Sequence, residues 1–400
     1  MASQSRITFL NLSIGRGHPF YLEGIVEAIN RSGKISLVRS VEEVTQIVPW
    51  PSRQAWKWVD WLYRHGSSPG FLATTYNRLR HQANYNNSRW SMSLLAAGLK
   101  SRFSTDSQPV VVSHPILVGI LRGRKGIIYQ HGEMVAPRES LVSGAELIIV
   151  PTQAVADQFA SIGYDPSQIL VSGLCIEPAI VRQAADAFTA RIDRFGGDQP
   201  LTGAFFSSGA EPRDHVEQLI AAAVAAASMD QRVIIFARQS GRLAQLTVKA
   251  FERRGMLFSR LDASAAIPAD LPPVLLAEFE NRREEVLLSC RLFREFDYLV
   301  SPAHERTNWA LGLGVPMFIL EPSKGSFAPL NRQLLLNHEV AFSLSSMNHA
   351  ASLGVKLESL RNRGALLAMA RAGWRRYDIS GFETIAAFLA SRFDRPTDSA

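Results

Sequence analysis

Short apolar runs alternate with segments of helical periodicity along most of the chain. Continuous apolar runs of this kind are typical of buried parallel strands, because helices cover both faces of such a sheet. The strands predicted in the first half are Ile7–Leu12, Ile35–Val38, Val110–Ser113, Gly126–Tyr129, Leu147–Val150 and Ile169–Val171. Since helical segments separate them, the sequence predicts a Rossmann-like, doubly wound α/β domain over residues 1–180.

A second series of the same kind follows a helical segment and a Gly-Gly-Asp linker within Pro178–Pro200. Its predicted strands are Leu201–Phe206, Val233–Phe236, Pro273–Ala277, Tyr298–Val300 and Val315–Leu320. Each precedes a helix, which predicts a second Rossmann-like domain over residues 198–378. We expect the last helix, within residues 381–400, to pack back on the first domain. The predicted fold class is α/β, with two doubly wound domains facing a central cleft.

Length and composition agree with two domains and indicate the cellular compartment. The chain has 400 residues, too many for one ordinary core, and 46% of them are hydrophobic. Its two cysteines, Cys175 and Cys290, offer neither a disulfide framework nor zinc-ligand spacing, so we expect a reducing compartment. The sequence has no signal-peptide pattern and no run near the ~18 apolar residues of a membrane span. These features predict a cytoplasmic protein.

The positive charge is concentrated in an aromatic segment, Trp50–Phe103. The whole chain has 43 Lys+Arg against 36 Asp+Glu, and this segment alone has eight basic residues and one acid. Apolar positions recur at helical spacing in two sets, which are Ala55, Trp58, Val59 and Leu62, and Leu72, Tyr76 and Leu79. Basic, tryptophan-rich amphipathic helices suit a membrane interface, although helices that merely cover a sheet have the same pattern. Nucleic-acid binding is not predicted, because no binding module is recognisable.

The first strand is followed by a glycine-rich loop and a helix, where ligands of doubly wound domains usually bind. Gly15 and Gly17 let the backbone approach a ligand closely, and the helix start offers free N–H groups. His18 is the imidazole of this loop, with a reference pKa near ~6.5 that suits proton transfer. The alternative is a tight turn whose histidine caps or supports the helix.

In the second half, the loop Ser207–Arg213 leads into a helix, whose N-terminus attracts phosphate. Ser207, Ser208 and Gly209 are small, and Arg213 can add a charge-assisted contact. This pattern predicts a diphosphate site, and the alternative is a plain turn capped by Asp214.

Further donor-binding candidates follow other strands of the second domain. Glu305 is a candidate ribose ligand, Thr307 or Asn308 a phosphate ligand, and Glu321 a ligand of sugar hydroxyls. A surface capping cluster is the alternative for the first three. We predict that a helix opens at Asn331. The predicted donor-binding set also includes His304 and Phe279.

With these segments in place, the chain resembles the GT-B glycosyltransferases. Within them it is most similar to the diacylglycerol glycosyltransferases, of the monogalactosyldiacylglycerol and diglucosyldiacylglycerol synthase types, and to the lipid-linked N-acetylglucosaminyltransferase of peptidoglycan synthesis, a family 28-like group. The resemblance is distant and covers roughly Ile7–Phe342. Its carriers, in family order, are SIGRGH, WLYRHGSSPGFLATTYNRL, VVSHPI, YQHGE, IIVPTQAVADQFASIGYDPSQILVSGL, SSGAEPR and FDYLVSPAHERTNWALGLGVPMFILEP.

The resemblance implies roles for particular residues. His18 falls at the family's Gly-Gly-His position and Glu133 at that of an acidic cleft residue, so either is a candidate base. The aromatic basic segment corresponds to the family's membrane and lipid-acceptor surface. Members use nucleotide sugars, commonly UDP-linked, without a bound metal, and this chain has no Asp-x-Asp. Two positions depart from the family, because Trp309 stands where a ribose-binding Glu is found and Phe327-Ala328 near the place of a sugar-contacting pair.

The resulting prediction is a glycosyltransferase that moves a hexosyl group from a nucleotide sugar to a lipid or membrane-associated hydroxyl, with inversion, at the periphery of the membrane. A UDP-sugar 2-epimerase-like enzyme is one alternative. A GT-B protein that binds lipid or nucleotide without turnover is the other.

Overall fold

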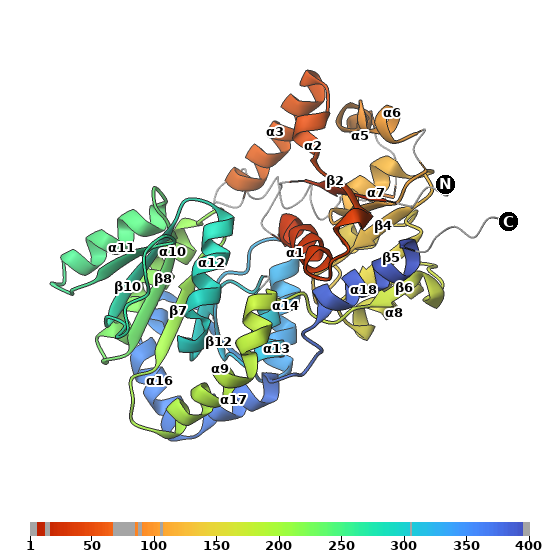
Figure 1. Ribbon diagram of the computed structural model, residues 1–400. Coiled ribbons are helices and arrows are strands. Elements are labelled where there is room, and N and C mark those ends of the chain that lie inside the picture. The colour runs from red at the N-terminus through yellow and green to blue at the C-terminus, as the bar shows by residue number, and fades with distance from the viewer. Residues whose placement is uncertain are drawn as a thin grey trace. The chain divides into compact units, whose positions relative to one another are not determined.

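The computed structural model describes residues 6–12, 17–66, 85–86, 90–104, 107–304 and 306–394, with the backbone alone for 17–18, 62–66, 90–92 and 104 (Figure 1). The chain divides into two compact units. Unit 1 comprises Met1–Ile176 and Tyr377–Ala400, and unit 2 comprises Glu177–Arg376. Each unit is built on a parallel sheet.

Unit 1 contains a six-stranded sheet in the order β2-β1-β3-β4-β5-β6. Its strands are β1 (Ile7–Asn11), β2 (Val38–Glu43), β3 (Val110–Val112), β4 (Ile127–Gln130), β5 (Leu147–Val150) and β6 (Ile169–Val171). Its helices are α1 (Gly17–Arg31), α2 (Val44–Ile47), α3 (Trp50–Gly66), α5 (Trp90–Ala96), α6 (Leu99–Ser104), α7 (Pro115–Leu121), α8 (Gln153–Ser161) and α18 (Gly381–Phe393). The doubly wound α/β fold predicted for the first half is thereby confirmed.

The strand predicted at Ile35–Val38 is wrong in position. Ile35–Leu37 form a 3-10 helix, and β2 begins only at Val38. Because β2 is an edge strand paired with β1 alone, its side chains are partly buried or exposed and include no continuous apolar run. A search for buried runs therefore selects the residues just before it.

Helices α1 and α18 cover one face of this sheet. Phe9, Tyr21 and Phe382 belong to one buried cluster there. The Phe382 ring occupies the space beside Gly24 of α1, since a Cβ on Gly24 would lie 2.2 Å from the Phe382 Cζ. The end of the chain therefore completes the core of unit 1.

The opposite face is packed by α7 and α8 and by parts of α3 and α5. Trp56 anchors α3, because its indole is buried and Nε1 donates to the Leu95 carbonyl at 3.3 Å. The helix predicted from Ala55, Trp58, Val59 and Leu62 is confirmed, but its inward face is different, since Trp58 is exposed. The Leu62 side chain and the helix predicted at Leu72, Tyr76 and Leu79 lie outside the described residues.

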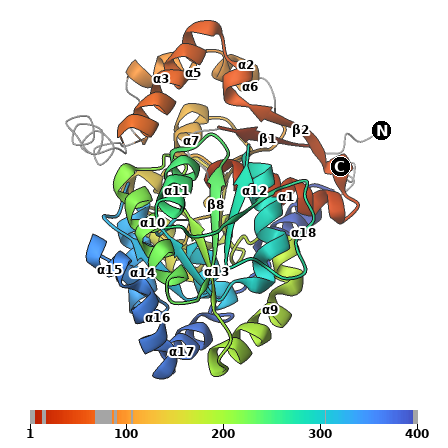
Figure 2. The same ribbon diagram turned by 90° about the vertical axis from the view of Figure 1, so that its left-hand side faces the viewer.

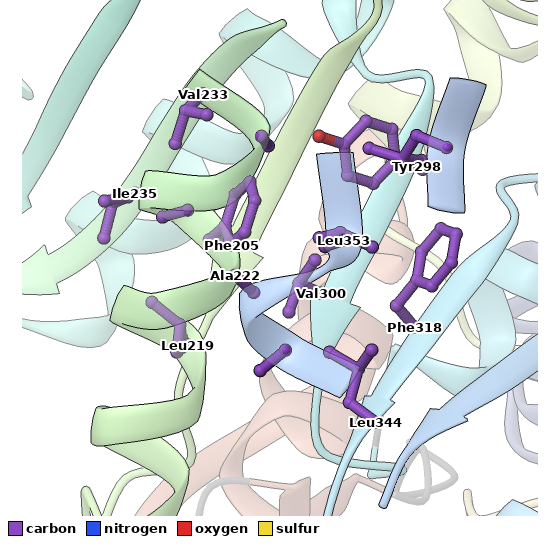
Figure 3. Close-up of a cluster of buried hydrophobic side chains, with 14 of the residues drawn as sticks. Phe205, Leu219, Ala222, Val233, Ile235, Tyr298, Val300, Phe318, Leu344 and Leu353 are labelled. Carbon is purple, nitrogen blue, oxygen red and sulfur yellow. The ribbon is translucent and has the colours of Figure 1, made fainter. Parts of the chain in front are cut away.

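Unit 2 contains a seven-stranded parallel sheet in the order β13-β12-β11-β7-β8-β10-β9. Its strands are β7 (Thr202–Phe206), β8 (Arg232–Arg238), β9 (Ser259–Asp262), β10 (Val274–Phe279), β11 (Tyr298–Ser301), β12 (Met317–Leu320) and β13 (Ala341–Leu344). Its helices are α9 (Pro178–Gly196), α10 (Arg213–Ala227), α11 (Arg242–Glu252), α12 (Arg282–Leu292), α13 (Thr307–Leu313), α14 (Phe327–Asn337), α15 (Met347–Ala351), α16 (Leu353–Asn362) and α17 (Ala365–Gly373). Figure 3 shows the core formed where α10 and α16 pack on the sheet, with Phe205, Leu219 and Leu353 among its side chains.

Two strands of unit 2, β9 and β13, are missing from the sequence prediction. Both are edge strands of four residues. β9 has the sequence Ser-Arg-Leu-Asp and buries only Leu261, so it has no apolar run. In the part of the chain that the structure describes, no helix is long and apolar enough to cross a membrane.

Candidate functional site

The winding of each sheet marks one position where a ligand is expected. In unit 2 the chain runs from β7 to β8 on one side and later returns to β11 on the other side of β7. In unit 1 the same reversal occurs between β1 and β3. Crevices for ligands form outside the carboxyl ends of the strands at such reversals. The loop after β7 and the loop after β11 are therefore the primary candidates in unit 2.

The loop after β7 contains the predicted diphosphate residues and ends at α10. Ser207 is buried, directly after the strand, while Ser208 and Gly209 follow it with greater exposure. Helix α10 begins at Arg213 with Pro212 as its N-cap, and no side chain caps it. Arg213 is exposed and pairs with Glu217 at 2.7 Å. A 15-residue helix thus points its N-terminus at the predicted crevice, and its dipole favours an anion there.

Three side chains of the first turns of α10 fasten it to the loop after β12. His215 Nε2 lies 2.8 Å from the Pro322 carbonyl oxygen. Gln218 donates to the Glu321 carbonyl at 2.5 Å and accepts from the Glu321 N–H at 3.1 Å. Asp214 pairs with Lys324 at 2.6 Å and accepts the His215 N–H at 3.0 Å, and it lies inside the first turn, because the N-cap is Pro212. These bonds fix the position of the α10 N-terminus relative to the sheet edge.

Burial lowers the pKa of His215, although the Pro322 carbonyl and Asp214 favour the protonated ring. The imidazole is therefore neutral near pH 7, with Nε2 protonated to donate to Pro322.

Glu321 uses its carboxylate to hold its own loop. One oxygen accepts from the Ser323 N–H at 2.7 Å and from the Ser323 hydroxyl at 3.1 Å. The other accepts from the Ser343 hydroxyl at 3.3 Å and pairs with Arg332. Its contact with sugar hydroxyls stays a prediction, and these bonds would compete with it.

Arg306, in the loop after β11, is a central residue that the sequence reasoning did not select. Its guanidinium lies 3.6 Å from the ring centroid of Phe206, the last residue of β7, and 5.3 Å from that of Trp309. It also pairs with Glu285 of α12 at 2.9 Å, and both side chains are largely buried. Arg306 therefore joins three elements at the β7–β11 reversal. The available signal was an arginine beside Glu305 at a strand end.

The other predicted donor residues of unit 2 occupy different environments. Thr307 and Asn308 are buried in the first turn of α13, and His304, partly buried, accepts the Thr307 N–H at 2.9 Å through its carbonyl. Phe279 is the buried last residue of β10. Glu305 lies outside the described residues.

The prediction that a helix opens at Asn331 is wrong. Helix α14 begins at Phe327, and Asn331 lies one turn inside it. The side chain is buried and donates to the Ala303 carbonyl at 3.2 Å. Asn331 therefore ties α14 to the loop after β11. The sequence Phe-Ala-Pro at 327–329 obscured the start, because Pro329 is tolerated in a first helical turn but suggests a break when it is read alone.

In unit 1, the backbone of α1 begins at Gly17 and places His18 in the first turn. The His18 side chain and Gly15 lie outside the described residues, so the catalytic role of His18 stays a prediction. Glu133 follows β4 by three residues and is partly buried. Its charge adds to the effect of burial, which raises the pKa of Tyr129.

His131 lies between Tyr129 and Glu133 in sequence, and its ring contacts other residues of the same segment. Its ring is buried, with Nδ1 3.3 Å from the Tyr129 hydroxyl and Nε2 3.1 Å from the Val135 carbonyl oxygen. Gly132 lies against the Tyr21 ring, where a Cβ would be only 2.2 Å from Cε1. The segment after β4 is thus closely packed on α1.

Similar folds are found among solved structures, although not among protein sequences. No family model matches the sequence, and no curated protein does. S. aureus MnaA, in a co-structure with UDP, is 10% identical over 99% of both chains, with a TM-score of 0.58. The UDP-GlcNAc 2-epimerase from Neisseria meningitidis, bound to UDP-GlcNAc, is 9% identical over 97% of this chain and 99% of its own, with a TM-score of 0.57. Acinetobacter baumannii MurG is 12% identical over 96% and 99%, with a TM-score of 0.52.

The chain has the GT-B fold. The predicted fold class is thereby confirmed. Identities this low establish the fold alone, and the finer grouping with diacylglycerol glycosyltransferases stays a prediction.

Trp309, which stands where the resembled family has a ribose-binding Glu, has a structural role in unit 2. The indole is buried and packs against Phe206, Phe293 and Phe296. Its Nε1 donates to a carboxylate oxygen of Glu177 at 3.2 Å. Burial raises the pKa of Glu177, although its own N–H, Arg306 and the indole stabilise the charged form. Trp309 therefore serves the core of unit 2 instead of presenting a polar group to a ligand.

In the described parts of the chain, no group of three or more His, Cys, Asp or Glu side chains has the arrangement of a metal site.

Proposed function

We propose that the protein is a glycosyltransferase that moves a hexosyl group from a nucleotide sugar, with UDP as the nucleotide, to a hydroxyl of a lipid or membrane-associated acceptor. The observation that carries the proposal is the uncapped N-terminus of α10, held by its neighbours at the β7–β11 reversal of a GT-B unit. Support also comes from similar folds that were solved with UDP or UDP-GlcNAc, and from MurG, a glycosyltransferase.

In the proposed reaction, His18 or Glu133 removes the proton of the acceptor hydroxyl. The oxygen attacks the anomeric carbon while the bond from that carbon to the diphosphate breaks, and the nucleotide diphosphate leaves with the electron pair. The dipole of α10 and the N–H groups at its start stabilise the negative charge that develops on the diphosphate, apart from the His215 N–H, which donates to the Asp214 carboxylate at 3.0 Å. A single displacement of this kind inverts the anomeric configuration.

The test is an assay of the purified protein with a panel of UDP-hexoses and lipid acceptors, diacylglycerol among them. Mass spectrometry should detect a glycolipid and one equivalent of free UDP. Absence of both with every donor and acceptor pair contradicts the proposal.

The two candidate bases are distinguished by His18→Ala and Glu133→Ala. Loss of the general base should lower kcat by roughly 10²- to 10⁴-fold, whereas loss of the other residue should cost less. UDP binding, measured by calorimetry, should be retained in both variants because α10 belongs to unit 2. Equal, small effects on kcat would remove both residues from the role of base.

A second function is favoured by the epimerases among the similar folds. A UDP-sugar 2-epimerase would invert C2 of UDP-GlcNAc without any acceptor, which proton NMR of the sugar detects. The third possibility is a binding protein without turnover, motivated by Trp309 and by Phe327-Ala328. It predicts UDP binding together with no activity that His18→Ala or Glu133→Ala could remove.

The acceptor proposal includes peripheral membrane contact on the cytoplasmic side, through the aromatic basic segment Trp50–Phe103. Its eight basic residues and single acid would favour an anionic surface.

A further inference from the structure

Glu211, in the loop after β7, has a backbone conformation that its residue type rarely adopts. Its φ is +44°, in the left-handed region where glycine is the usual residue. Its N–H donates to the Ser208 carbonyl at 3.0 Å, which closes a four-residue turn directly before Pro212, the N-cap of α10. Because glutamate is less favourable than glycine in this conformation, the contribution of the side chain has to come from its contacts.

The Glu211 carboxylate lies at the start of α11. Its Oε2 accepts the Leu243 N–H at 3.1 Å. Gly241 is the N-cap of α11 and has no side chain that could accept this bond. Glu211 therefore takes the place of an N-cap side chain, and its negative charge is favourable at the positive end of an 11-residue helix. Figure 2 shows α10 and α11 as neighbours in unit 2.

Gly241 leaves the space that this carboxylate occupies. A Cβ at position 241 would lie 2.7 Å from Glu211 Oε1 and 3.0 Å from the Arg238 carbonyl oxygen. The backbone of Gly241, with φ −74° and ψ 160°, is open to any residue, so conformation does not require glycine there. Arg242 adds a second bond between the segments, because its Nη1 donates to the Glu211 carbonyl at 3.3 Å.

The loop after β7 is consequently held from two sides. Glu211 ties its turn to α11, while His215 and Gln218 tie the first turns of α10 to the loop after β12. A loop that is already ordered loses less conformational entropy when a ligand binds. We propose that Glu211 is a positioning residue, whose carboxylate holds the turn 208–211 in the conformation that receives the donor diphosphate at the start of α10. This inference rests on the proposed function for its ligand and deepens it.

The test is calorimetric titration of the full chain with UDP, without an acceptor. Glu211→Gly removes the carboxylate and also relieves the left-handed φ, so the melting temperature should stay close to that of the wild type. The Kd for UDP should rise about tenfold, because the loop must then be ordered on binding. Glu211→Gln keeps an oxygen that can accept the Leu243 N–H, so its Kd should rise less than about threefold.

Gly241→Ala tests the same contact without changing Glu211. The added Cβ would displace the carboxylate, which is the far end of a flexible side chain, so the Kd for UDP should rise at least about fivefold at little cost in melting temperature. This variant decides the question if Glu211→Gly does not fold. Glu339→Gly is the matched control, because Glu339 is an exposed glutamate of unit 2 with φ +55°, and its Kd should equal that of the wild type.

Hydrogen exchange of the protein without ligand gives a second readout. The amides of residues 208–213 and of Leu243 should exchange faster in Glu211→Gly and Gly241→Ala than in the wild type. Unchanged exchange in both variants would overturn the inference. So would a Kd within about twofold of the wild type in either variant that folds, or a wild type that does not bind UDP.

The inference and the proposed function fail separately, because this titration does not measure transfer. If UDP affinity depends on Glu211 but no hexosyl group reaches any acceptor, the transferase proposal alone is wrong. If the wild type transfers a hexosyl group and the variants bind UDP as tightly as it does, the positioning role alone is wrong.

Discussion

His215 links the first turn of α10 to the loop after β12, and because its ring is buried, the stability of the fold should depend on pH. Asp214, Lys324 and Glu321 are the charged groups around it. Because the pKa is lowered in the folded state, the unfolded chain, with a reference pKa near ~6.5, binds a proton first as the pH falls. Stability that is complete above about pH 6.5 is therefore lost as the pH falls through that value.

We expect His215→Gln to flatten this dependence, because glutamine keeps an N–H donor for Pro322 but does not titrate. The measurement is the melting temperature between about pH 7.5 and about pH 5.5, on either side of the reference pKa. His349→Gln replaces an exposed histidine and should leave the profile unchanged. Identical slopes for wild type and His215→Gln would contradict the prediction.

Arg191 has a wholly buried guanidinium that donates hydrogen bonds to backbone carbonyls of two distant segments. Its Nε donates to the Phe296 carbonyl at 2.9 Å, and its Nη1 donates to the carbonyls of Leu313 and Gly314 at 3.0 and 3.3 Å. Burial lowers the pKa of Arg191 to about 10. Arg191→Met should reduce the free energy of unfolding by about 3 kcal/mol, since it leaves buried carbonyls without donors.

The control for Arg191 lies on the same helix. Arg182 is exposed on α9, and Arg182→Met should change stability by less than about 0.5 kcal/mol. Denaturant unfolding measures both variants. A loss below about 1 kcal/mol for Arg191→Met would mean that water replaces the guanidinium.

At the scale of elements, the contact between α1 and α18 makes glycine more favourable than alanine at position 24 of helix α1. Alanine normally stabilises a helix interior relative to glycine by about 1 kcal/mol. At Gly24 the added Cβ would collide with the Phe382 ring, so Gly24→Ala should destabilise the protein by about 1–3 kcal/mol.

Gly196→Ala provides the comparison for Gly24→Ala. Apart from its chain neighbours and the nearby backbone of α9 itself, no heavy atom lies within 4 Å of the Cβ that this change adds, so it should be neutral or stabilising by up to about 1 kcal/mol. Thermal or denaturant unfolding of both variants tests the pair. A stabilised Gly24→Ala would mean that α18 does not seat Phe382 against α1.

Elements also show why parts of the site could be predicted. A buried strand followed by small residues and a helix is visible in a single stretch, so the position of the loop between β7 and α10 could be predicted, while its binding of a diphosphate stays a prediction. Edge strands β2, β9 and β13 bury too little apolar surface to leave a pattern. Arg306 was missed because its partners Phe206 and Glu285 are far from it in sequence.

At the scale of the whole molecule, the end of the chain belongs to the core of unit 1. Phe382, Ile385 and Leu389 are buried there with α1. Removal of residues 377–400 should cost on the order of 5 kcal/mol in lost burial, enough to unfold unit 1. Unit 2 has its own core and should remain folded.

Hydrogen exchange measured by mass spectrometry would test the truncation. Amide protection should collapse in the strands of unit 1 and persist in β7, β8 and β11 of unit 2. A separate peptide of residues 377–400 should restore protection in unit 1. Unchanged protection of unit 1 in the truncated chain would show that α18 contributes little.

The sequence by itself determined the alternation of buried strands and helices, and with it two doubly wound units, because burial on both faces leaves continuous apolar runs. It also determined where small residues precede a helix. Only the tertiary structure decided which side of α3 is exposed, that Trp309 serves a core, and that Arg306 stacks on Phe206. Those facts depend on contacts between segments that are far apart in the sequence, and the local pattern of apolar and polar residues does not determine which segments make contact.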